Sequence, residues 1–149
     1  MNDILNFFQS TERIGTAGQP TAEQFRDIAD AGYAAVINIA MHDSEGAIPE
    51  EGNIVASLGM DYVHIPVPFD APSAEHLRRF FGAMNTLEGE KVFVHCALNM
   101  RVSVFMYKYL TLVEGRTPED SESPILAGWR NNMDEAWQGI LDLTAQEID

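Results

Sequence analysis

A cysteine and an arginine stand close together between a short apolar run and a long apolar segment. They belong to the stretch Val92-Phe-Val-His-Cys-Ala-Leu-Asn-Met-Arg-Val-Ser103, and Cys96 is the only cysteine of the chain. We expect a strand, a loop and a helix here, with successive backbone N–H groups curling around a point just past the strand. The helix start carries roughly half a positive charge, which favours a bound anion and the thiolate form of Cys96.

Three side chains of this loop fit the same chemistry. Arg101 supplies a permanent cation whose planar fork suits two oxygens of a tetrahedral oxyanion. Asn99 lies where the loop needs a positive φ angle, which asparagine adopts more readily than most residues. Ser103 is placed to donate a hydrogen bond to the sulfur. The stretch therefore predicts a nucleophile with a site for phosphate, sulfate or arsenate. The other residues expected to support the anion are His95, Ala97, Leu98 and Met100.

The rest of the chain alternates between patterns typical of strands and of helices, and we expect these elements to position the loop. The expected strands cover residues 13–17, 34–39, 61–65 and 90–95, the first of them as an edge strand. The expected helices cover residues 21–31, 50–58, 73–87 and 101–113, with shorter helices after residue 117. Continuously apolar strands separated by helices indicate an α/β fold, with a mostly parallel central sheet of about four to five strands and helices on both faces. Ligands bind beyond the carboxyl ends of such strands, which is where Cys96 lies.

Length and charge limit the classes of function. The 149 residues contain no repeat or linker, so we expect a single domain over residues 1–149. The formal net charge of −14 repels nucleic acid and anionic membranes, so neither is an expected partner. The sequence has no apolar segment long enough to cross a bilayer and no signal-like start, and we expect a cytoplasmic location.

Residues that could bind a metal are few and scattered. A single cysteine allows neither an intrachain disulfide nor a multi-cysteine metal site. His42 and His64 have no partner at a spacing typical of metal ligands. We therefore predict no metal and no other cofactor.

The loop resembles the His-Cys-x5-Arg-Ser/Thr loop of the cysteine-dependent protein tyrosine and dual-specificity phosphatases. His95 and Cys96 end a strand, and an arginine and a serine begin the next helix. The resemblance extends over about residues 13–113 to small bacterial phosphatase-like domains, through three further stretches: Gly18-Gln-Pro20, Val36-Ile-Asn-Ile39 and Tyr62-Val-His-Ile-Pro66. It implies the dual-specificity-phosphatase-like fold and hydrolysis of a phosphoric monoester through a phosphocysteine intermediate.

One feature of the loop departs from that family. Four residues separate Cys96 from Arg101, where the family has five, although Ser103 keeps the family distance of seven from the cysteine. One interpretation is a loop of preserved length in which the arginine has moved one place forward, which turns its side chain by about 100°. The other is a loop shortened by one residue, with a tighter cradle.

The resemblance also implies a role for each candidate residue. Cys96 attacks phosphorus, while Arg101 and the loop amides hold the equatorial oxygens. Asp70, in a stiff loop between prolines, occupies the position of the family's general acid, with Asp43 and Glu45 as rivals and a plain turn residue as the alternative. His95 has a structural role at the loop backbone. The residues expected at the rim of the site are Gln19, His42 and Asp43.

Three functions therefore remain open. The first is a phosphoric monoester hydrolase, and the second is a pseudophosphatase that binds a phosphate-bearing ligand or a free anion without turnover. The third is a rhodanese-like sulfurtransferase, because a cradle with four intervening residues is closer to that class. Each of them places an oxyanion or a phosphate ester at the Cys96 loop.

Overall fold

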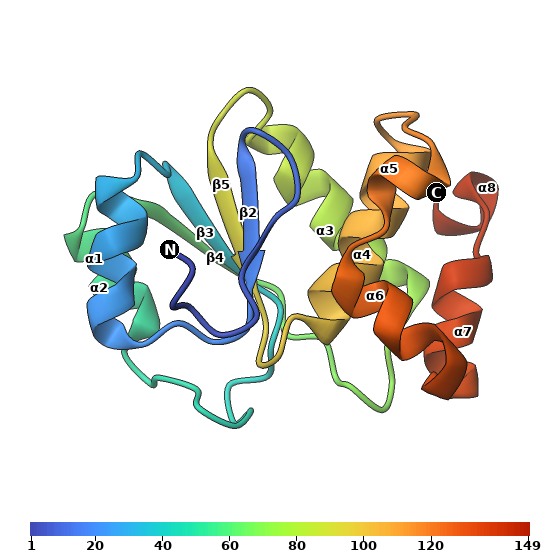
Figure 1. Cartoon of the computed structure of the whole chain (residues 1–149), viewed down its shortest axis with the longest axis horizontal. Coiled ribbons are helices and arrows are strands. Elements are labelled where there is room, and N and C mark those ends of the chain that lie inside the picture. The colour runs from blue at the N-terminus through green and yellow to red at the C-terminus, as the bar shows by residue number, and fades with distance from the viewer.

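Five strands form one sheet in the order β1-β2-β5-β3-β4 in the computed structural model, which describes residues 1–149 (Figure 1). The strands are β1 (Phe8–Gln9), β2 (Ile14–Ala17), β3 (Ala35–Asn38), β4 (Asp61–His64) and β5 (Val92–His95). Only β1 runs antiparallel to its neighbour. In the register of the parallel strands, Ala17 and Asn38 both pair with His95, so three strands end level where the Cys96 loop begins. The predicted mostly parallel sheet is confirmed.

The prediction that residues 13–17 form an edge strand is wrong. β2 is buried along its whole length and lies between β5 and β1. The edge position belongs to β1, in which Phe8 pairs with Thr16 and Gln9 with Gly15. Because β1 has only two residues, it carries no alternating pattern from which a strand could be predicted.

Helices cover both faces of the sheet, as the sequence predicts (Figure 1). The helices α1 (Ala22–Asp30) and α2 (Glu51–Ser57) pack on one face, with Phe25, Ile28 and Val55 in a core that includes Phe93 of β5. The helices α3 (Ala74–Thr86) and α4 (Met100–Leu112) pack on the other face. The chain ends in α5 (Pro118–Ser121), α6 (Pro124–Trp129), a 3-10 turn (Arg130–Asn132), α7 (Glu135–Asp142) and α8 (Ala145–Ile148).

Side chains at the helix starts explain where several helices begin. The Thr21 hydroxyl accepts a hydrogen bond from the backbone N–H of Gln24, and the Gln24 side chain accepts one from the backbone of Thr21. This capping box begins α1 at the predicted place. Ser73 likewise accepts from the backbone N–H of His76 at the start of α3. Such caps each contribute about 1 kcal/mol.

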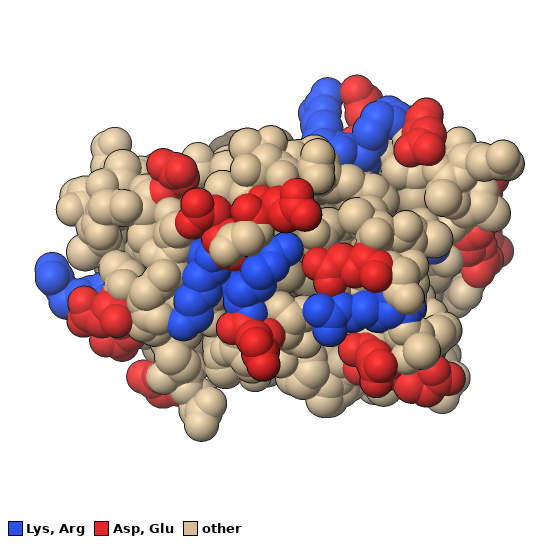
Figure 2. Space-filling model, turned by 90° about the horizontal axis from the view of Figure 1, so that it is seen from above, with Lys and Arg blue, Asp and Glu red and all other residues tan.

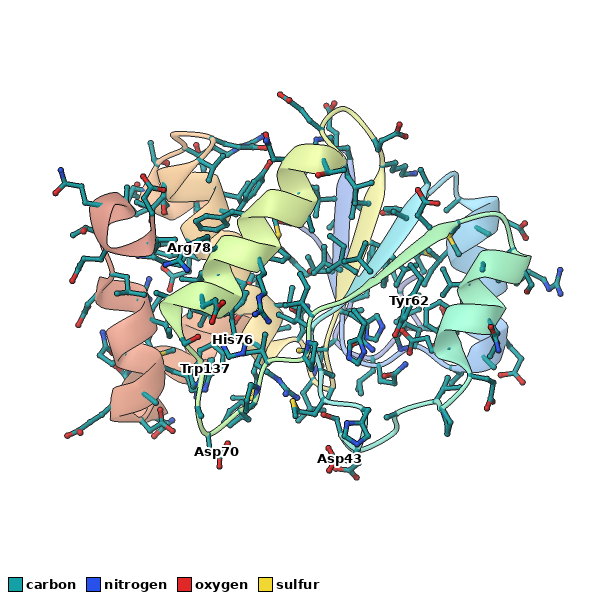
Figure 3. The ribbon with its side chains drawn as sticks, turned by 180° about the vertical axis from the view of Figure 1, so that it is seen from behind. Asp43, Tyr62, Asp70, His76, Arg78 and Trp137 are labelled. Atoms are coloured by element: carbon teal, nitrogen blue, oxygen red, sulfur yellow. The ribbon has the colours of Figure 1, made fainter.

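The C-terminal helices support a loop of the sheet's carboxyl edge. Trp137 of α7 is fully buried, and its indole Nε1 donates to the carbonyl of Phe69 at 2.7 Å. The Phe69 ring also lies 5.7 Å from the Trp129 ring, centre to centre. Figure 3 shows Trp137 beside the loop that carries Asp70. Trp129 and Trp137 therefore hold the loop between β4 and α3.

The opposite end of the molecule carries mixed charges. Figure 2 views the end where the strands begin, and Lys and Arg side chains there lie between Asp and Glu side chains. Glu114, for example, pairs with Arg13 at 3.5 Å and with Arg116 at 2.8 Å. Surface pairs of this kind contribute little stability. No helix in the structure has the length and apolar character needed to cross a bilayer.

Candidate functional site

The loop between β5 and α4 exposes a row of unpaired backbone donors. β5 ends at His95 and α4 begins at Met100, with Asn99 in the left-handed conformation at a φ of 70°, as predicted. No hydrogen bond within the protein is donated by the backbone N–H groups of Ala97, Leu98, Met100, Arg101 and Val102. Neighbouring unpaired amides at a helix start form an anion-binding concavity.

The turn after β2 holds this loop from one side. The backbone N–H of Gln19 donates to the carbonyl of Ala97 at 2.9 Å. A Cβ on Gly18 would lie 2.5 Å from that same carbonyl oxygen, so only glycine permits the approach. The Gln19 side chain, predicted at the rim, donates to Glu51 at 2.7 Å and to the Pro20 carbonyl at 3.0 Å, and Gln19 lines a cavity together with Ala97 and Leu98.

The N-terminal segment holds the loop from another side. The Asn6 side chain donates to the carbonyl of Leu98 at 2.9 Å. In return, the Asn99 side chain donates to the carbonyl of Asn6 at 2.9 Å and to the Thr16 hydroxyl at 3.2 Å. Asn6 was not among the predicted site residues, because a lone asparagine near a chain end has no motif around it.

A buried carboxylate partners His95. Nε2 of His95 lies 2.7 Å from Oε2 of Glu51, and Nδ1 lies 3.0 Å from the carbonyl oxygen of Cys96. The backbone contact is the structural role predicted for His95. Glu51 was not predicted, since an acidic residue at the start of a short helix usually faces solvent. Burial alone would raise the pKa of Glu51, but the hydrogen bond and charge of His95, with hydrogen bonds from Gln19 and Tyr62, hold that pKa below its usual value.

Cys96 itself is 1% exposed and belongs to the hydrophobic core that also contains Val102 of α4. The expected hydrogen bond from Ser103 to the sulfur is not made. The Ser103 hydroxyl instead donates to the carbonyl of Met100 at 2.6 Å. This difference has a local cause, because a serine in the first turns of a helix can reach back to a preceding backbone carbonyl.

Arg101 is buried between two rim loops. Its Nη1 donates to the carbonyl of Val67 at 2.8 Å, and its Nη2 lies 3.5 Å from the Ser44 hydroxyl. The guanidinium also lies over the Phe69 ring, 5.6 Å from its centre. Arg101 therefore joins the start of α4 to the loop after β3 and to the loop after β4.

The predicted acids lie at the tips of these same loops. Asp70 and Asp43 are both exposed and form no hydrogen bond or ion pair. Figure 3 shows the two side chains at one edge of the molecule, each on its own loop. His42 is exposed as well, and it lines a cavity of about 320 Å³ together with Tyr62 and His64.

Apolar side chains form another part of the rim. Leu98, in the loop that follows Cys96, is 47% exposed, as is Leu5 beside it. Both line a cavity of about 310 Å³ with Pro20, Glu45 and the backbone of Ala97. If an anion binds the unpaired amides after Cys96, an apolar group attached to that anion could pack against Leu5 and Leu98.

Comparison with known proteins places these features in a family. The profile of the family described as "DSP-PTPase phosphatase fused to NAD+ Kinase" matches residues 6–138. A crystal structure of a phosphatase-like protein (DUF442) from Shewanella putrefaciens CN-32 is 34% identical, with a TM-score of 0.87, and the match covers 99% of this chain and 93% of that chain. TpbA of P. aeruginosa, in complex with phosphotyrosine, is 13% identical with a TM-score of 0.71, covering 95% of this chain and 85% of that one.

A longer relative contains only a part that corresponds to this chain. The beta-lactamase hydrolase-like protein of Xylella fastidiosa (strain Temecula1) is 29% identical over 112 residues, which is 73% of this chain. The matched part covers 26% of that protein, so this chain spans about a quarter of its length.

Proposed function

The chain belongs to the family of DSP-PTPase phosphatases described as fused to NAD+ kinase, and on that premise we propose that it hydrolyses phosphoric monoesters with Cys96 as the nucleophile. The Cys96 thiolate attacks phosphorus, and the phosphorus–oxygen bond to the leaving group breaks. Asp70 gives the leaving oxygen its proton, and water then hydrolyses the phosphocysteine. The unpaired amides of the loop carry this proposal, because such donors stabilise the oxygens of a phosphoryl group in transfer.

Arg101 can bind the anion without leaving the rim loops. A guanidinium has five N–H donors in a rigid fork. In this chain its hydrogen bonds to Val67 and Ser44 engage one donor each, which leaves three for phosphate oxygens. The Cys-x4-Arg spacing is therefore compatible with a cradle in which one arginine holds both the substrate and the loop that carries Asp70.

Turnover of a generic aryl phosphate by the purified chain tests the proposal. We expect steady hydrolysis of p-nitrophenyl phosphate, abolished by Cys96→Ser and by Arg101→Ala, and phosphocysteine on Cys96 after acid quenching. Absence of turnover between pH 5 and pH 8 in a folded protein would overturn the hydrolase proposal. A persulfide on Cys96 after thiosulfate treatment, without hydrolysis, would assign the loop to sulfur transfer instead.

A second candidate function is binding of a phosphate-bearing ligand without turnover. It is favoured by the exposed, unpartnered Asp70, which has no contact that orients it as an acid, and by the Val67 carbonyl, which already engages part of the Arg101 guanidinium. Calorimetric titration with inorganic phosphate distinguishes the two. Binding that Arg101→Ala abolishes, in a protein with no hydrolysis, would select this second function.

A further inference from the structure

His95 has a hydrogen-bond acceptor at each of its ring nitrogens. Both His95 and Glu51 are buried, at 0% and 2% exposure. The carboxylate oxygen of Glu51 lies 2.7 Å from Nε2, and the carbonyl oxygen of Cys96 lies 3.0 Å from Nδ1. Beside an ionised Glu51, a neutral imidazole, which carries one N–H, would leave a bare nitrogen facing an oxygen in a buried place. Only the imidazolium donates through both nitrogens.

We propose that Glu51 is a positioning residue that holds His95 as an imidazolium next to Cys96 and thereby favours the Cys96 thiolate. The positive charge of His95 lies between the carboxylate and the nucleophile loop, so the loop faces the positive end of the pair. In a buried place this field is weakly screened, and a nearby cation favours a thiolate over a thiol. The inference rests on the proposed function in taking Cys96 as the nucleophile.

The surroundings of Glu51 support its ionised form. Its other oxygen accepts a hydrogen bond from the Gln19 side chain at 2.7 Å. Tyr62 of β4, the titratable neighbour from that strand, keeps its proton because burial raises its pKa to about 12. On the α1 side, His95 faces the uncharged Phe25 ring, 6.0 Å away between centres. A buried carboxylate with these donors is paired and satisfied.

Glu51 reaches the nucleophile loop along two paths. Through His95 it contacts the carbonyl of Cys96, and through Gln19, whose backbone N–H donates to Ala97, it contacts the next residue. Both carbonyls are thereby engaged by protein groups, and the following amides, those of Ala97 and Leu98, donate no hydrogen bond within the protein and remain available to an anion. One carboxylate therefore sets both the charge and the backbone orientation at the nucleophile.

The protonation of His95 is measurable in the unaltered chain. We expect 15N NMR at pH 7.5 to report protons on both ring nitrogens of His95, and on one nitrogen only in Glu51→Gln. A singly protonated His95 ring in the natural chain would overturn the inference, whether or not any variant folds. Because this readout needs no substrate, failure of the inference is distinguishable from failure of the proposed function. A His95 ring with two protons in a chain without turnover would contradict the hydrolysis alone.

The effect on Cys96 is measured by its alkylation with iodoacetamide as a function of pH. We expect Glu51→Gln to move the midpoint of the rate profile up by roughly one pH unit, which lowers the rate at pH 6 about tenfold. Glu50→Gln, at the exposed neighbour, is the matched control and should leave the profile unchanged. In a His95→Gln background, Glu51→Gln should add no further shift. An additional shift there, or an unchanged midpoint in the single variant, would contradict the proposed path.

Discussion

Asn6 and Asn99 are joined by a hydrogen bond across 93 residues of sequence, from the Asn99 side chain to the Asn6 carbonyl at 2.9 Å. They are also the only two residues other than glycine with positive φ angles, 52° and 70°. The left-handed conformation costs most residues roughly 1–2 kcal/mol. At Asn99 this cost is offset by the hydrogen bonds of its side chain, so the N-terminal segment stabilises the conformation of the Cys96 loop.

Substitutions of Asn99 separate backbone strain from lost hydrogen bonds. Asn99→Gly tolerates the φ angle but loses both side-chain hydrogen bonds, which costs about 1–2 kcal/mol of unfolding free energy. Asn99→Ala loses the same bonds and adds strain, so it should be less stable than the glycine variant by about 1 kcal/mol. Urea denaturation measures both. Equal stability of the two variants would show that the loop changes conformation when the side chain is lost.

Substitutions of Asp70 and Asp43 distinguish the two acidic loops. With Asp70 as the general acid, Asp70→Asn should lower kcat for an aryl phosphate by about 10²–10⁴ and remove the alkaline limb of the pH–rate profile. Asp43→Asn is the matched control, because Asp43 is equally exposed on the neighbouring loop. The reverse pattern would assign the acid to Asp43.

Close packing at Gly18 predicts a large effect of one methyl group. Gly18→Ala places a Cβ 2.5 Å from the Ala97 carbonyl oxygen, so the Cys96 loop must shift. We expect the free energy of unfolding to fall by about 1–3 kcal/mol and kcat/KM for an aryl phosphate to be reduced. Gly82→Ala, in the exposed middle of α3, meets nothing within 4 Å and should stabilise the chain by about 0.5–1 kcal/mol. Thermal unfolding of both variants, with kinetics, is the measurement. Full activity in Gly18→Ala would contradict the contact.

Tyr62 predicts a loss of stability at alkaline pH. Its pKa in the folded chain is about 12, chiefly because of burial, whereas an unfolded phenol titrates near pH 10. Between these two pH values the unfolded state binds fewer protons than the folded state. The contribution of the Tyr62 phenol to the free energy of unfolding is therefore fully present below pH 10 and declines as the pH rises to 12. Urea midpoints at pH 9 and pH 11.5 measure it. The stability difference between the natural chain and Tyr62→Phe should be constant below pH 10 and shrink above it, whereas a constant difference up to pH 11.5 would contradict the raised pKa.

Local patterns in the sequence were sufficient for several elements of the site. Three predicted features depend on residues within a few positions of one another: the left-handed Asn99, the start of a helix at Thr21 and the placement of Cys96 at a strand end. Backbone sterics and hydrogen bonding over one helical turn determine such features, so their residue types are enough to predict them.

The partners of the site residues were decided by the tertiary structure alone. Glu51 and His95 form their contact although 44 positions separate them in the sequence, and Arg101 donates to the Val67 carbonyl across a separation of 34 positions. These contacts depend on the strand order β2-β5-β3, which places the ends of segments that are distant in the sequence side by side. The sequence does not indicate which buried polar groups will form hydrogen bonds with one another. These pairs form only when the chain folds and water is excluded from the core, because a buried polar group then needs a partner within the protein.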